Sequence, residues 1–183
     1  MRQSRYPSFI HFDLSRHGHS ALTLRSLGRQ FPPPTHGYTY LAWLSIEHPP
    51  SDEDERLIVF GCGDATGKCH VEVTITPDLR LALATSLAKP PVVFAGFTFE
   101  TGKFYHVALV HQRPKYSTNS PVSLYIDGKL IEVAKAAYPV APPKDWEVQG
   151  WLGTPKDRVP AGRLEKGKSQ LKWDLGPTWL VSI

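Results

Sequence analysis

The carboxylates of this sequence are too dispersed to form the acid and nucleophile pair that hydrolyses a glycosidic bond. The only dense acidic run spans residues 52–55, where no apolar residue alternates with the acids, so we interpret it as a solvated loop. Glu72 and Glu132 each stand between two apolar residues, which predicts that each is the outward residue of its own strand. No nucleophile-elbow, phosphate-loop or zinc-protease motif occurs. The sequence therefore predicts that the protein is not an enzyme.

Potential metal ligands are equally sparse. Calcium prefers roughly six to eight oxygen ligands, but Asn119 is the only asparagine and no Asp-x-Asp pair occurs outside the acidic run. His17 and His19 could offer two imidazoles to zinc, yet no neighbouring cysteine or third histidine completes a set. Exposure on the surface is the preferred interpretation of both. We predict no metal and no cofactor.

The two cysteines, Cys62 and Cys69, lie at the ends of a glycine-rich loop between two strand-like runs. Facing positions across a hairpin could form a disulfide. Two thiols in a chain of 183 residues are, however, more typical of a reduced cytosolic protein than of a secreted domain held by disulfides. We therefore predict that both are free thiols.

The net charge of +4 is concentrated in residues 1–36, which hold five arginines and one aspartate. Such an excess could attract phosphate or an acidic partner. The arginines are scattered and no aromatic residues are interleaved with them, so a solvated face is the simpler explanation. Nucleic acid is therefore not an expected partner.

The stretch from Phe104 to Leu130 gives the strongest structural signal. Residues 104–111 alternate in the period of two that is typical of a strand, and residues 122–126 do the same. Asp127 and Gly128 follow at once, and this pair favours positive φ at both centres of a tight turn. The sequence therefore predicts a hairpin whose tip is Asp127-Gly128.

Short apolar runs of this kind recur along the whole chain, and 17 prolines and 14 glycines separate them. No run approaches the roughly 18 apolar residues that span a bilayer. The pattern predicts an all-β, antiparallel two-sheet jelly-roll sandwich with one domain over residues 1–183. The expected strands cover residues 8–12, 21–24, 37–46, 57–61, 70–76, 79–85, 92–99, 104–111, 122–126, 130–134, 148–152 and 173–181.

Two segments near the end of the chain carry further expectations. Residues 154–170 are polar and basic, which predicts a mobile loop. The final residues, W-L-V-S-I, are apolar and strand-like, which is unusual at a natural C-terminus. We therefore expect a domain cut from a much longer protein.

Aromatic residues on the expected strands are the candidate ligand contacts. Trp43, His106 and Tyr125 would line one groove if their strand faces belong to a single sheet. Packing of Trp43 in the core is the alternative, and the alternation alone does not separate the two.

Four motifs together resemble the concanavalin A-like, laminin-G-like sandwich, and the similarity covers about residues 9–183. They are G-Y-T-Y-L-A-W-L-S-I at 37–46, F-Y-H-V-A-L-V-H at 104–111, L-Y-I-D-G-K-L at 124–130 and W-L-G-T at 151–154. Within that superfamily, the order of these motifs and the closing L-G-P-T-W-L resemble the lectin-like domain of BEACH-domain proteins of the neurobeachin and beige type. The proline-rich loops and the insert at 154–170 depart from the common pattern.

The resemblance implies a module of a large cytoplasmic scaffold that associates peripherally with membranes and acts in vesicle traffic. Its expected partners are other domains of the parent protein or separate partner proteins. The alternative function is a lectin that binds an oligosaccharide without calcium. A reduced, cytosolic setting favours the first, because complex glycans face the lumen.

Overall fold

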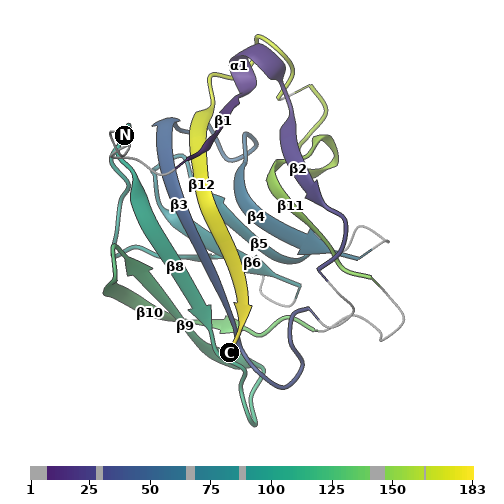
Figure 1. Ribbon diagram of the computed structural model, residues 1–183, viewed down its shortest axis with the longest axis vertical. Coiled ribbons are helices and arrows are strands. Elements are labelled where there is room, and N and C mark those ends of the chain that lie inside the picture. Colours follow the sequence, from purple (N-terminus) through teal and green to yellow (C-terminus); the bar gives the residue numbers. More distant parts are fainter. Residues whose placement is uncertain (1–7, 28–30, 65–68, 87–89, 141–146, 163) are drawn as a thin grey trace, which may run out of the picture.

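Two six-stranded antiparallel sheets pack face to face in the computed structural model, which describes residues 8–27, 31–64, 69–86, 90–140, 147–162 and 164–183 (Figure 1). Figure 1 shows them as two layers, one in front of the other. The predicted all-β concanavalin A-like sandwich is therefore confirmed. No helix among the described residues is long and apolar enough to cross a membrane.

Sheet A contains the two longest strands, which lie side by side. Its strands lie in the order β1 (Ile10–Asp13), β12 (Lys172–Ser182), β3 (Tyr38–His48), β8 (Tyr105–His111), β9 (Asn119–Ile126) and β10 (Lys129–Ala137).

Sheet B forms the second layer. Its strands lie in the order β2 (Ser20–Leu24), β11 (Gln149–Thr154), β4 (Leu57–Gly63), β5 (Cys69–Ile75), β6 (Leu81–Thr85) and β7 (Val92–Val93).

The hairpin between β9 and β10 has the predicted tip. Asp127 and Gly128 have φ of 50° and 79°, and Ile126 pairs with Lys129. The Asp127 carboxylate also accepts a 2.9 Å hydrogen bond from the N–H of His106, which ties the turn to β8. The sequence pair thus fixes both the turn and its contact with the next strand.

One expected strand is much shorter than the apolar pattern predicts. The run at residues 92–99 forms a strand only at Val92–Val93, because the chain then turns and the Phe94 N–H donates to the Leu81 carbonyl. Phe99 is buried and packs edge-on against Tyr105, with ring centroids 5.5 Å apart. Burial of aromatic side chains, rather than pairing of the backbone, therefore explains the rest of this run.

The core lies between the inner faces of the two sheets. On β3, Tyr38, Tyr40, Ala42, Leu44 and Ile46 are all buried on one face, as the alternation predicts. Tyr40 stacks on Phe60 of β4 with ring centroids 5.1 Å apart, which joins sheet A to sheet B.

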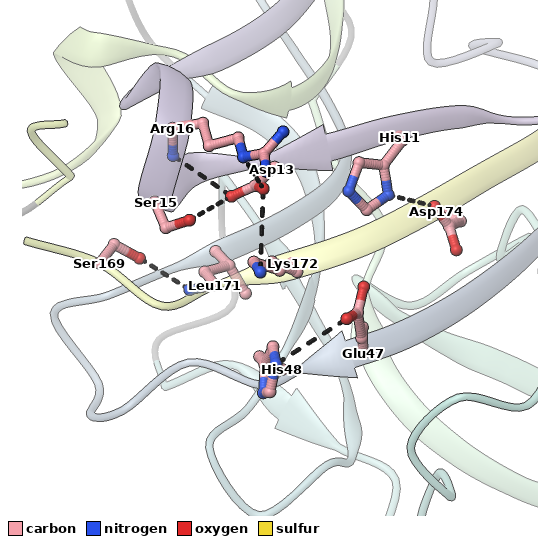
Figure 2. A network of polar contacts seen from close by, with 10 residues as sticks. All are labelled: His11, Asp13, Ser15, Arg16, Glu47, His48, Ser169, Leu171, Lys172 and Asp174. Carbon is pink, nitrogen blue, oxygen red and sulfur yellow. Dashed lines mark hydrogen bonds and ion pairs between the residues drawn. The ribbon is translucent and has the colours of Figure 1, made fainter. Parts of the chain in front are cut away.

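A polar network fixes one end of the sandwich, where a single helical turn, α1 (Leu14–His17), follows β1 (Figure 2). Asp13 caps this turn by accepting from the Arg16 N–H at 3.2 Å and from the Ser15 hydroxyl at 2.5 Å. Lys172 of β12 lies 3.8 Å from the same carboxylate. The pKa of Asp13 is lowered chiefly by the hydrogen bond from Ser15. Burial opposes this shift, whereas the hydrogen bond from the Arg16 N–H and the charges of Lys172 and Arg16 add to it.

The segment at 154–170 contains a 3₁₀ turn, η1 (Lys156–Arg158), and several anchored residues. Leu164 is fully buried in the core, and the Gly167 N–H donates to the Ser15 carbonyl at 3.0 Å. The predicted mobility of this segment stays a prediction, but these contacts tie it to α1.

Cys62 is fully buried in the core. Cys69 belongs to β5, where its backbone pairs with Gly63, but its side chain lies outside the described part of the structure. The predicted redox state of the pair therefore stays a prediction.

Candidate functional site

Trp43 and His106 form the centre of the candidate site. They face each other across β3 and β8, and their rings are tilted by 49° with centroids 5.3 Å apart. Both side chains are half-buried and lie on the outer face of sheet A, which is the face turned away from sheet B. Of the two alternatives for Trp43, the structure therefore has the ring on the outer face and not in the core.

Tyr125 shares this face. It is half-buried and lies opposite Ala108 of β8, which in turn lies opposite Leu41 of β3. All three candidates named from the sequence therefore lie on one face of one sheet. Tyr125 belongs to a different row of side chains from Trp43 and His106, so the three line a common surface rather than a single contact.

The row that contains Tyr125 crosses five strands and is entirely apolar or aromatic. Each member lies opposite the next on β12, β3, β8, β9 and β10. At about 4.8 Å for each of four steps, it spans roughly 19 Å. Half of the Trp179 side chain is exposed, as is 54% of Leu130 at the other end. We call it the first row, and its members are Trp179, Leu41, Ala108, Tyr125 and Leu130.

A parallel second row extends the apolar surface toward the end of β12. Val181 and Val133 at its two ends are 45% and 55% exposed. None of the side chains in either row is charged. The members of the second row are Val181, Thr39, Val110, Ser123 and Val133.

Trp179 is a site residue that sequence alternation alone misses. Trp173 and Leu175 of β12 face the core, and strict alternation would place Trp179 beside them. A register shift between Leu175 and Thr178 instead reverses the two faces, so that Trp179 points outward. The signal in the sequence is Gly176-Pro177, a pair that a regular central strand disfavours.

The outer face of sheet B has a different character, because its tryptophan is covered. Trp151 of β11 is 7% exposed and packs directly over Gly61 of β4. A side chain at Gly61 would collide with the indole ring, which explains the glycine. The guanidinium of Arg158, from η1, lies 4.4 Å from the centroid of the same ring and covers it.

Charged groups are buried beside Trp151. Glu72 faces away from the core, as predicted, but it is only 2% exposed because the guanidinium of Arg56 forms an ion pair with it. Burial raises the pKa of Glu72, while the charges of Arg56 and Arg158 oppose the shift. Its neighbour on the same face, His70, lies 3.3 Å from the carboxylate of Asp64.

Two expectations about the acidic residues are wrong. Glu132 does not point outward, because a register shift between Leu130 and Glu132 turns it toward the inner side at the sheet edge. There it accepts a 2.7 Å hydrogen bond from the Gly96 N–H. Within the acidic run at 52–55, Glu55 is not solvated: it is 5% exposed and accepts from the Ser51 N–H at 2.6 Å.

The potential metal ligands stay apart. His17 is exposed, whereas burial lowers the pKa of His19, whose Nδ1 has no hydrogen-bond partner among the described residues. Among the described residues, no three His, Cys, Asp or Glu side chains gather closely enough to hold a metal ion.

The relatives of the chain are parts of much longer proteins. BEACH domain-containing protein A2 of Arabidopsis thaliana is 26% identical over 164 residues, which cover 73% of this chain and 5% of that protein. WD repeat- and FYVE domain-containing protein 4 of Mus musculus is 26% identical over 238 residues, covering 98% of this chain and 7% of that protein. The chain thus spans only a small fraction of the relatives it matches.

The fold also occurs in solved structures of enzymes. An alginate lyase from Pseudomonas aeruginosa matches with a TM-score of 0.55 and 13% identity, over 99% of this chain and 87% of the lyase. At this identity the likeness concerns the fold alone. The family model described as the concanavalin A-like lectin/glucanases superfamily matches residues 16–161. The chain therefore belongs to the concanavalin A-like lectin/glucanase superfamily, and BEACH domain-containing proteins are among its relatives.

Proposed function

We propose that this domain is a non-catalytic interaction module of a BEACH-type scaffold protein that acts in intracellular membrane and vesicle traffic. Its contact surface is the outer face of sheet A, defined by the first and second rows. The partner is another domain of the parent protein or a separate protein. The domain resides in the cytoplasm and reaches membranes only through the full-length protein.

The observation that carries this proposal is that neither row holds a charged side chain and that the first row is apolar or aromatic throughout. Trp179, Leu130, Val181 and Val133 are each about half exposed and lie on one sheet face. Contiguous apolar patches of this kind mark contact surfaces in soluble proteins. Aromatic side chains such as Trp179 are also enriched among the residues that contribute most to binding between proteins.

The arrangement of carboxylates supports a role without catalysis. Retaining and inverting glycosidases need two carboxyl groups roughly 5–10 Å apart across one groove. Here Glu72 lies on sheet B and Glu132 on sheet A, and Arg56 already neutralises Glu72. Hydrolysis of a β-glucan that is abolished by Glu72→Gln or Glu132→Gln would overturn this part of the proposal.

Binding of an oligosaccharide without calcium is the second candidate. It is favoured by the adjacent rings of Trp43 and His106, with Tyr125 on the same face, because sugar rings stack on aromatic faces. A millimolar affinity needs only about −4 kcal/mol, which one stacked ring and a few hydrogen bonds could supply. The two rows nevertheless offer more apolar area than hydrogen-bonding groups, which suits a protein contact better.

A pull-down beside a glycan array separates the two candidates. The purified domain is used to capture the remaining segments of the parent protein, and the same preparation is applied to the array. We expect capture of a protein segment and no glycan signal of comparable strength. Trp179→Asp should abolish capture, since it buries a charge in the contact.

Val140→Asp is the matched control, because Val140 is 55% exposed and lies outside the two rows. It should leave capture unchanged. Equal loss with both variants, or binding to a glycan that Trp43→Ala removes from a folded domain, would contradict the protein-contact proposal.

A further inference from the structure

We propose that a cleft on the outer face of sheet B binds a lysine or arginine side chain presented by a basic, extended segment of another protein. The argument is independent of the function proposed for sheet A. It rests on the shape of the cleft, on its apolar floor and on a buried carboxylate that forms no ion pair with any described residue.

The cleft has a volume of about 350 Å³, at the lower end of the range of about 300–1,000 Å³ that is typical of ligand pockets. Its floor comes from three neighbouring strands, where Thr74 of β5, Ala82 of β6 and Val93 of β7 lie side by side in register. Prolines form the walls, and they are Pro77, Pro90 and Pro91.

Glu55 lines this cleft and is the central observation. The residue is 95% buried, as its 5% exposed fraction shows, and its Oε2 accepts the Ser51 N–H. No ion pair of Glu55 with a lysine, arginine or histidine occurs in the described part of the chain. A buried carboxylate is normally paired with a cation, because removal from water penalises the charged form.

The arginines that line or adjoin the cleft are already engaged. Arg56 pairs with Glu72, and Arg80 pairs with Asp78 at 2.9 Å. Glu53, which also lines the cleft, forms no ion pair with another described residue. The cleft therefore carries an excess of negative charge that its own described cations do not balance.

These features fit a long cationic side chain better than the alternatives. A lysine or arginine can lay its aliphatic stem on Ala82 and Val93 while its charged head reaches Glu55. A metal ion would need several converging ligands, which the described residues do not provide here. Phosphate groups of lipids or nucleic acids would be repelled by Glu53 and Glu55.

Fluorescence anisotropy with a defined probe tests the proposal. The probe is a fluorescein-labelled peptide of alternating lysine and alanine, and its control is the same peptide with Nε-acetylated lysines. We expect the full chain to bind the lysine peptide at least about tenfold more tightly than the acetylated one, since charged hydrogen bonds are lost on acetylation. Equal affinity for both peptides would overturn the proposal.

Three variants locate the binding. Glu53→Gln with Glu55→Gln should weaken binding by at least about tenfold, whereas Glu100→Gln, an exposed acid outside the cleft, should change it by less than about twofold. Val93→Lys tests the cleft while Glu55 stays in place. Val93 is 43% exposed on an edge strand, so a lysine there should compete with the peptide for the cleft and weaken its binding. Loss with Glu100→Gln equal to the loss with the cleft variants, or unchanged binding by Val93→Lys, would show binding elsewhere and contradict the proposal.

Discussion

The outer faces of the two sheets differ in how far their tryptophan side chains are exposed to water. On sheet A, Trp179 is half exposed and the half-buried Trp43 packs against the ring of His106. On sheet B, Trp151 packs over Gly61 and is covered by Arg158. One sandwich thus carries an exposed tryptophan among uncharged rows on one side and a covered tryptophan beside buried charges on the other. The difference fits the two proposals above, in which the rows of sheet A contact an apolar protein surface and the cleft on sheet B binds a cationic side chain.

The largest expected difference between the two faces is the loss of stability when Trp151 and Trp179 are each replaced by alanine. Trp151→Ala is expected to lower the free energy of unfolding by about 3–5 kcal/mol, because it empties a buried site under Arg158. Trp179→Ala should cost less than about 1 kcal/mol, because half of the ring already faces water. Urea unfolding of both variants measures this, and equal losses would mean that the two faces do not differ.

The pH dependence of stability should come from the core and not from the outer face of sheet A. His111 of β8 is fully buried, and burial lowers its pKa to about 4 while its Nδ1 shares a 3.0 Å hydrogen bond with the Tyr38 hydroxyl. The unfolded chain binds the proton near pH 6.5, so stability should fall as the pH drops from 6.5 to 4, by about 3 kcal/mol at most.

His111→Gln keeps an acceptor near Tyr38 but cannot titrate. The difference in unfolding free energy between wild type and this variant should therefore change across pH 6.5 to 4 and stay constant above it. A difference that is constant over the whole range would remove His111 as the cause.

The buried ion pair on sheet B should contribute little to stability. Burial raises the pKa of Glu72 despite Arg56, which means that the charged form is penalised in the folded protein. Glu72→Gln leaves the Arg56 guanidinium without its partner, but 36% of that side chain is exposed to water, so we expect stability to change by less than about 1 kcal/mol at pH 7. The contribution of Glu72 should be present below pH 4.5 and lost as the pH rises through its raised pKa, so the variant should become more stable relative to wild type as the pH rises. Thermal melts of wild type and variant at several pH values measure this, and a large loss at pH 7 would contradict it.

The sequence was sufficient for the features that depend on local patterns. Asp127-Gly128 predicted the hairpin. Strand alternation gave Trp43, His106 and Tyr125 as candidates on the condition that their strands share a sheet, and the pairing of β3, β8 and β9 supplies that condition. Both depend on a period of two or on a turn of two residues, which the chain encodes locally.

The features that the sequence did not predict depend on bulges and on contacts between distant segments. One extra residue near Gly176-Pro177 turns Trp179 outward, and another near Leu130 turns Glu132 inward. The cover over Trp151 comes from η1, and the burial of Glu55 depends on packing of its loop against sheet B. Alternation within a strand carries no information about any of these.

Hydroxyl-radical footprinting of the tryptophans tests the central claim most directly. The isolated domain is compared with a longer form of the parent protein, and the rate of oxidation is measured for Trp43, Trp179 and Trp151. We predict that Trp43 and Trp179 react in the isolated domain and are protected in the longer protein or in the presence of the captured partner, whereas Trp151 is protected in both. Equal reactivity of Trp179 in both forms, with or without the partner, would contradict the assignment of the outer face of sheet A as the contact surface.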